Sequence, residues 1–300
     1  CSIPIKDSAV MSRMKEPDLR RIWRKRILDH DGESTGSGGI ERWYKLTDGL
    51  GLDREYVQST DGIMKLLSGY PTFKKDKMFS QVNRKIDELM SEGYGTIVIK
   101  NPQGKHSLGV GILNKLNLIF EGSLGYFGVG SCDGLNVRIT GRVGWSCAQN
   151  LMAGKVVVEK NAGSSFGAAI RGGDLICKGS VGARTGIDMK GGTIIVGGDA
   201  GAFTGFMMQR GRIIVLGDVG INLGDSMYDG TIFIGGKIGS LGSDAVTSDL
   251  TSSDKDWLKR KLKVAEIDEN FDVSKMTKII AGKKLWNYDN LEPAEKKGAI

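Results

Sequence analysis

The feature that most constrains this fold is a glycine turn with a strict 19-residue period. A four-residue unit of glycine, any residue, an apolar residue and glycine begins at Gly122 and recurs at this interval as far as Gly239. Seven units follow one another without an insertion, and the only lapse is Lys160 in place of a first glycine. So strict a period indicates a solenoid in which each repeat is one coil stacked on the next.

Short apolar triplets precede the turns and identify the repeating element. They occupy residues 156–158, 175–177, 194–196, 213–215 and 232–234. Runs this short and this rich in β-branched residues are strands. Equivalent strands run in the same direction, so they pair in parallel about 4.8 Å apart. The pattern predicts a mainly β protein: a right-handed parallel β-helix of about seven 19-residue coils, roughly 34 Å long, preceded by a short incomplete α-helical segment.

Three further columns follow from the same period. Glycine is expected at positive φ at two corners of each coil, in the turn units, which include Gly201 and Gly220, and in a column from Gly154 to Gly230. A third column indicates an interior ladder rather than a thioether site for a metal or cofactor. It consists of Cys132, Leu151, Ile170, Met189, Met208 and Met227.

Strand alternation directs the middle residue of each triplet outward. These residues are Ile119, Val157, Ile176, Ile195, Ile214 and Phe233, interrupted only by Arg138. A contiguous apolar strip on a surface usually marks an interface. We therefore expect the strip to be covered, either by another segment of this chain or by a partner subunit.

The repeat, its lead-in at residues 101–106 (Asn-Pro-Gln-Gly-Lys-His), its exit at 240–245 (Ser-Leu-Gly-Ser-Asp-Ala) and a tail at 278–288 resemble the GXGXG β-helix of glutamate synthase. The free-standing subunit of glutamate-synthase-like and N-methylglutamate-synthase-like enzymes is more similar still, over residues 78–290. The resemblance implies a structural subunit that positions a glutaminase-type amidotransferase subunit and an FMN-dependent glutamate synthase subunit. It also implies that this chain alone binds no cofactor, with FMN and an iron–sulfur cluster on a partner subunit. A scaffold like the β-helical subunit of formylmethanofuran dehydrogenase is the alternative.

Few residues of the predicted β-helix are suited to catalysis. Asp199, Asp218 and Asp225 fall at turns, where Asp commonly accepts backbone hydrogen bonds. His106 lies in the lead-in with no second His or carboxylate close in sequence. No Ser-His-Asp or Cys-His order supports a nucleophile, and no GxG string opens a helix in a βαβ unit. We expect a non-catalytic subunit of a glutamate-synthase-type oxidoreductase.

Residues 1–77 follow a helical pattern instead. A first helix is predicted behind Pro17 and ends near residue 32, a second passes through residues 40–46, and a third passes through Tyr56 and Ile63. The apolar positions of the first helix are Leu19, Ile22, Trp23, Ile27 and Leu28.

Residues 3–11, 20–32 and 38–43 resemble the central helices of pyrroloquinoline-quinone (PQQ) synthase, a haem-oxygenase-like helical family. In that family the His of the Leu-Asp-His-Asp-Gly motif lines the active site, which implies His30 as the candidate catalytic residue, in proton transfer. The family also uses helices on both sides of this stretch. We expect His30 to be a vestige rather than a working catalyst. Three origins of the N-terminal segment stay open: a natural fusion, a vestige and a truncation. PQQ-synthase-like oxidase activity of this segment stays open as an alternative function.

Composition and charge exclude several classes of protein. No run approaches the roughly 18 apolar residues of a membrane span. Four irregularly spaced cysteines form neither a disulfide framework nor a metal knuckle, and no secretory signal is recognisable, so we expect a cytoplasmic protein. The net charge of +7 comes from helical runs at 20–26 and 255–263, expected as solvated faces and not as a nucleic-acid site.

The chain is divided by these patterns into three parts. They are a partial haem-oxygenase-like α-helical segment at 1–77, the GXGXG parallel β-helix at 78–250 and a helical C-terminal tail at 251–300. The start at Cys1 suggests a fragment or a processed end.

Overall fold

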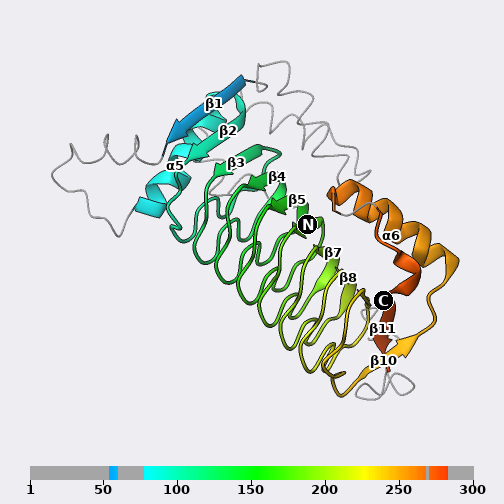
Figure 1. Ribbon diagram of the computed structural model, residues 1–300. Helices are drawn as coiled ribbons and strands as arrows, with labels where there is room; N and C mark the ends of the chain where they lie inside the picture. The colour runs from blue at the N-terminus through cyan, green and yellow to red at the C-terminus, as the bar shows by residue number, and fades with distance from the viewer. Residues whose placement is uncertain (1–53, 60–77, 268–269, 283–300) are drawn as a thin grey trace, which may run out of the picture.

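The computed structural model describes residues 54–59, 78–267 and 270–282, which form a long β-solenoid (Figure 1). The described strands make one sheet in the order β1-β2-β3-β4-β5-β6-β7-β8-β9-β11-β10. The stacked parallel strands are β2 (Tyr94–Lys100), β3 (Asn117–Glu121), β4 (Asp133–Ile139), β5 (Ala153–Val158), β6 (Asp174–Cys177), β7 (Lys190–Val196), β8 (Arg210–Val215) and β9 (Thr231–Ile234). The predicted mainly β fold of about seven stacked coils is confirmed.

The strands pair in the register that the sequence period requires. Ile194 lies opposite Ile213, and Ile213 lies opposite Ile232, so that each residue meets its equivalent in the next repeat. The turn units stack in the same way. Isolated parallel β-bridges join the apolar residues of successive units, for example Ala162 and Val181. One sequence repeat is therefore one turn of the solenoid.

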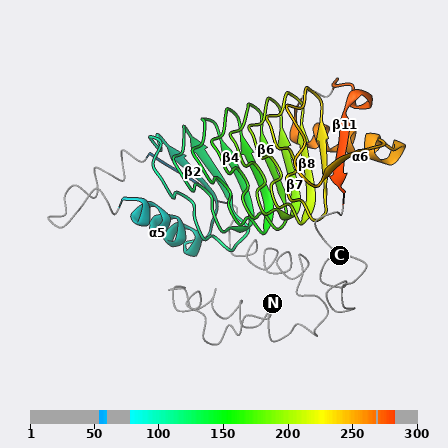
Figure 2. The ribbon, with the colours of Figure 1, turned by 90° about the horizontal axis from the view of Figure 1, so that it is seen from below.

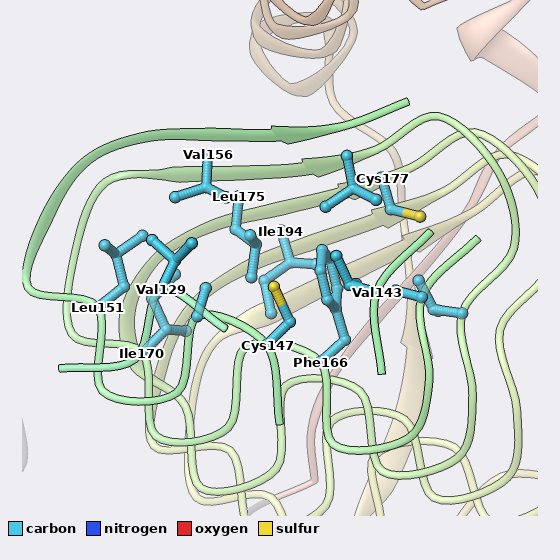
Figure 3. Packing of buried hydrophobic residues seen from close by; sticks show 14 of the residues in the cluster. Val129, Val143, Cys147, Leu151, Val156, Phe166, Ile170, Leu175, Cys177 and Ile194 are labelled. Carbon is cyan, nitrogen blue, oxygen red and sulfur yellow. The ribbon is translucent and has the colours of Figure 1, made fainter. Parts of the chain in front are cut away.

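Apolar side chains fill the interior of the coils in stacked columns (Figure 3). In one column Val156, Leu175 and Ile194 are completely buried on successive paired strands. The column of Cys132, Leu151, Ile170, Met189, Met208 and Met227 is at most 1% exposed. The predicted interior ladder is confirmed, and its thioethers belong to the core.

Glycine serves the coils in two distinct ways. The column from Gly154 to Gly230 has positive φ, 107° and 101° at these two ends, as predicted. The same expectation is wrong for Gly201 and Gly220, which do not adopt positive φ. A Cβ at Gly201 would lie 2.5 Å from the backbone nitrogen of Ala183, so the absence of a side chain allows one coil to approach the next.

The third side of each coil, for example residues 145–150 and 164–169, lacks a strand and uses left-handed backbone conformations. In one coil Ser165, Gly167 and Ala169 have φ of 58°, 67° and 52°. The N–H of Ser165 donates to Ala183 of the next coil at 2.8 Å, and that of Gly167 donates to Cys147 of the previous coil at 2.9 Å. Hydrogen bonds in both directions offset the conformational cost of roughly 1 kcal/mol per non-glycine residue.

Helix α5 (Met78–Ser91) lies at the β2 end of the solenoid (Figure 2). Val82, Ile86 and Leu89 lie one helical turn apart and are buried in the core of the first coils. Strand β1 (Arg54–Ser59) pairs in parallel with β2.

The third predicted helix is therefore wrong at Tyr56, which lies in strand β1. Tyr and Val suit a strand, and the edge of β2 supplies the backbone partners. The first two predicted helices lie outside the described residues.

The C-terminal end of the solenoid is closed by a returning strand. After α6 (Ser252–Ala265) and the short helix η3 (Val273–Lys275), strand β11 (Thr277–Ala281) runs antiparallel between β9 and β10 (Ala245–Ser248). The tail, predicted as helical, thus contains a strand because the edge of β9 offers backbone partners. No helix in the described part of the chain is both long and apolar enough to cross a bilayer.

Candidate docking surfaces

Helix α6 covers the outward apolar strip of the sheet (Figure 1). The strip residues Ile176, Ile195, Ile214 and Phe233 are at most 1% exposed. They form a second apolar cluster with Leu258, Leu262 and Ala265, which lie on one face of α6. The prediction that the strip is covered is confirmed for these four residues, and the cover is a segment of this chain. Val157 is only partly buried against the cluster, and Ile119 is half-buried and lies outside it.

Polar contacts fix α6 at both ends. At its start Thr251 and Asp254 form a reciprocal capping box. The Asp254 carboxylate also lies 2.8 Å from the ammonium of Lys278 in β11. Further along, the Lys261 ammonium lies 2.6 Å from the carboxylate of Asp174 at the start of β6. The helix therefore runs along the solenoid, across successive coils.

The pKa of Asp254 reflects this anchoring. Burial by itself raises the pKa of the carboxyl, but hydrogen bonds from Lys278 and Thr251 and the attraction of the ammonium outweigh it. The net pKa is lowered from its ordinary value. The carboxylate form of Asp254 is thus the form that holds the helix.

The outer face of α6 is basic and exposed. Lys259, Arg260 and Lys263 are exposed to solvent, as predicted for this basic run, whereas Lys261 is half-buried and paired with Asp174. At the rim of the covered strip, the guanidinium of Arg212 lies 4.4 Å from the centre of the Trp257 ring, within cation–π range.

Three stacked aromatic rings lie at the N-terminal end of the solenoid. The ring centres are 4.6 Å apart for His106 and Tyr126 and 5.3 Å apart for Tyr126 and Trp145. Nδ1 of His106 accepts the backbone N–H of Tyr126 at 2.8 Å. The ring of Tyr126 extends over the next coil, because a Cβ at Gly144 would lie 2.5 Å from its Cδ1. The 19-residue spacing of Tyr126 and Trp145 is the sequence signal that could have indicated this stack.

The turn carboxylates join neighbouring coils. Oδ1 of Asp199 accepts the N–H of Asp218 at 2.8 Å, and Oδ1 of Asp218 accepts that of Lys237 at 2.7 Å. Asp225 accepts the N–H of Ser243 in the same way. The interpretation of the three aspartates as turn residues is confirmed.

Comparison with protein families decides the assignment of the solenoid. The model of the family described as GXGXG motif matches residues 94–286, more than half of the chain. The chain belongs to the GXGXG motif family. The GXGXG match includes α6 and β11 as well as the repeats, so the covered strip lies within the family's region.

The chain carries a second match outside the GXGXG domain. The TENA/THI-4/PQQC family model matches residues 1–62, so the N-terminal part is PQQ-synthase-like. His30 lies in this match but outside the described residues, and its role stays a prediction.

Curated relatives of this second kind carry the name PQQ synthase. The enzyme of Gluconobacter oxydans (strain 621H) is 38% identical over 130 residues, 42% of this chain and 50% of the relative. The bifunctional coenzyme PQQ synthesis protein C/D of Methylorubrum extorquens is 36% identical over 129 residues, 42% of this chain and 32% of the relative. PQQ synthase of Xanthomonas oryzae pv. oryzae is 65% identical over 57 residues, 19% of this chain and 23% of the relative. This chain spans half or less of the length of each.

The cysteines of the GXGXG domain are buried free thiols, namely Cys132, Cys147 and Cys177. Burial raises the pKa of Cys132 and of Cys177 to about 11, and it also raises the pKa of Cys147. These thiols are therefore protonated and weakly nucleophilic at neutral pH. Across the described ranges, no group of three His, Cys, Asp or Glu side chains is placed to hold a metal ion.

Proposed function

We propose that this chain is the structural GXGXG subunit of a glutamate-synthase-like amidotransferase and oxidoreductase complex. The observation that carries the proposal is the GXGXG match over residues 94–286, a region whose described coils form a filled rod. In this role the chain positions a glutaminase-type subunit and an FMN-dependent synthase subunit relative to each other. FMN and an iron–sulfur cluster are carried by a partner.

The physical properties of the rod suit this role. Close-packed interiors are stiff and transmit strain, so surfaces at different coils keep a fixed separation. Turn carboxylates and inter-coil backbone hydrogen bonds tie each coil to the next, as at Asp199 and Ser165. Two partners bound to such a rod are held in a constant relative orientation.

Co-purification tests the proposal. The tagged full chain is expressed with the glutaminase-type and FMN synthase-type subunits of the same genome. We expect one complex containing all three, with glutamine-dependent activity of the synthase subunit that is lost when this chain is omitted. Association instead with the subunits of a formyl-transferring dehydrogenase would favour the alternative scaffold. Full activity without this chain would contradict a structural role.

A second candidate function rests on the N-terminal match. The identity of 65% over 57 residues with PQQ synthase of Xanthomonas oryzae favours oxidase activity in PQQ synthesis, with His30 in proton transfer. We expect the full chain to form no PQQ from the synthase substrate. Turnover by the full chain that is abolished in His30→Ala would reverse this ranking.

A further inference from the structure

The outer face of the sheet carries a second apolar patch at its N-terminal end, beyond the strip under α6. The Val98–Ile119 patch consists of Val98 in β2 and Ile119 in β3, which lie opposite each other in register. The next outward residue, Arg138 in β4, is exposed and pairs with Glu159 at 3.0 Å. Val98 is only 3% exposed, and Ile119 is half-buried. This patch therefore has a cover of its own.

The described helices do not supply that cover. Val98 belongs to neither apolar cluster of the described residues. Helix α6 ends beside β5, where the ammonium of Lys155 donates to the carbonyl oxygen of Val264 at 2.9 Å. Strand β2 lies three strand spacings further along the sheet, about 14 Å away. Helix α5 packs on the opposite face of β2, because its buried residues belong to the interior cluster. The cover is thus a segment outside the described residues.

The cover belongs to this chain, because Val98 is buried within a single copy of it. Three longer segments lie outside the described residues: 1–53, 60–77 and 283–300. The last follows β11, which pairs with β9, seven strand spacings or about 34 Å from β2. Residues 60–77 join the end of β1 to α5, which packs on the interior side. Residues 1–53 join the solenoid only at β1, directly beside β2. The position of the patch therefore favours residues 1–53.

Polar residues border the patch and limit its cover to the width of one helix. On one side, Nδ2 of Asn117 in β3 donates to Oγ1 of Thr96 in β2 at 3.3 Å. On the other side, Lys100 in β2 and Glu121 in β3 form an ion pair of 4.0 Å. Helix α6 covers the continuation of the same column with a single apolar face. An amphipathic helix is therefore the form of cover that suits the patch.

The sequence of residues 1–53 contains such a helix. The helix predicted behind Pro17 carries Leu19, Ile22, Trp23 and Ile27 at intervals of three and four residues. Most of the stability of a helix in a protein comes from packing such an apolar face on another element. Residues 17–28 correspond to a helix of about 18 Å, long enough to cross the first strands of the sheet. Basic residues accompany its apolar stripe, as they do in α6.

We propose that residues 17–28 form a helix that packs over the Val98–Ile119 patch and docks the PQQ-synthase-like segment on the outer face of the solenoid. The docked helix continues the line of α6, and Arg138 separates the two covers. A short segment buries too little apolar surface to be stable alone, and this contact supplies the missing surface. It also places His30, two residues after the helix, at the N-terminal end of the solenoid. The inference is independent of the proposed function, because it concerns contacts within this chain only.

Photo-cross-linking identifies the segment that covers the patch. Benzoylphenylalanine replaces Ile119 in the full chain, and a matched variant carries it at Thr247, an exposed residue of β10. Mixing with isotope-labelled protein distinguishes links within one chain from links between copies. We expect links from position 119, but not from position 247, to residues 17–28 of the same chain. Links from position 119 to residues 60–77, to residues 283–300 or to a second copy would overturn the proposal, as would the absence of any link.

Hydrogen exchange measures whether the helix depends on the patch. Ile119→Asp places a charge in the patch and should raise the exchange rates of the amides at 17–28 at least tenfold. Asn136→Asp, at an exposed position of the neighbouring strand β4, should leave them unchanged. Unchanged exchange at 17–28 in a folded Ile119→Asp protein would overturn the proposal.

A reciprocal change decides the matter if Ile119→Asp does not fold. Ile22→Asp alters the predicted helix and should leave hydrogen exchange in strands β3 to β9 as it is in the wild type. In the protein with benzoylphenylalanine at position 119, it should reduce the links to residues 17–28 at least tenfold. Arg21→Asp, at a basic position of the same predicted helix, should leave the links unchanged. Links that persist at the wild-type level in Ile22→Asp would show that the apolar stripe does not contact the patch, and the proposal would be wrong.

Discussion

The ammonium of Lys278 lies 2.8 Å from the carboxylate of Asp254, and this pair joins the last strand of the solenoid to the first turn of α6. The same carboxylate accepts the backbone N–H of Thr251 at 3.0 Å. Both partners of the ion pair are largely shielded, with side chains 16% and 19% exposed. One residue therefore begins the covering helix and fastens it to β11.

Asp254→Ala should lower the free energy of unfolding at pH 7 by about 1–2 kcal/mol, because it removes the capping box as well as the ion pair. The folded-state pKa of Asp254 is below its unfolded value, so its stabilisation is complete above about pH 4 and is lost as the pH falls through the folded pKa. Urea denaturation at pH 7 and at pH 3 measures both effects. Asp256→Ala, at an exposed position of the same helix, is the control. An equal loss at the two pH values would contradict the linkage.

Gly201→Ala should destabilise the protein by about 1–3 kcal/mol, as overpacking does, because the new methyl group would meet backbone atoms of Ala183. Gly104→Ala is the matched comparison: its φ is +65° and nothing lies within 4 Å of an added Cβ. That variant should cost only the left-handed backbone strain, roughly 1 kcal/mol. Thermal and urea unfolding of the two proteins distinguish steric contact from strain, and a neutral Gly201→Ala would show that the coils can separate without cost.

Leu258→Ala should cost about 2–5 kcal/mol, since this side chain is completely buried between α6 and the strip. Limited proteolysis should then cleave near α6 faster than in the wild type. Val264→Ala, a change at a 51% exposed position of the same helix, should alter neither stability nor cleavage. Identical cleavage rates for Leu258→Ala and Val264→Ala would mean that α6 is not held by its apolar face.

Alkylation should not modify Cys132, Cys147 or Cys177 in the folded protein at pH 8. The thiols are buried, and with pKa values of about 11 at Cys132 and Cys177 only about one molecule in a thousand carries the thiolate at either site. Peptide mass spectrometry after iodoacetamide treatment, with and without denaturant, measures this site by site. Rapid labelling of Cys147 in the native state would indicate opening of the coils.

The sequence period was sufficient to predict much of this fold. The 19-residue repeat fixes the pairing of Ile194 with Ile213, the buried methionine column and the outward strip. These predictions succeed because successive strands of a parallel solenoid all pair in the same register, so the pattern of one repeat applies to every other repeat. The turn aspartates followed from the same spacing.

Other features depend on contacts that the period does not encode. The sequence did not determine whether this chain or a partner covers the strip, because the hydrophobic effect is non-directional and any apolar surface can supply the cover. Residues 277–281 form a strand because the edge of β9 is adjacent, whereas a short apolar run reads equally as helix or strand. The conformation of Gly201 could not be predicted, because glycine serves positive φ and close approach alike. His106 and Tyr126 are 20 positions apart, one out of phase with the repeat, so the period did not indicate that His106 joins the stack of Tyr126 and Trp145.

The cover provided by α6 also limits how a protein of this kind can change in length. Duplication of one 19-residue coil between β6 and β9 would keep every interior column and every turn contact. It would also leave an extra outward isoleucine beyond the reach of a helix that ends at Ala265. Near β4 the outward residue is Arg138, which is exposed and paired with Glu159, so a coil gained or lost there would disturb no cover. Lineages of this domain should therefore vary in coil number on the β4 side and keep the count fixed beneath α6.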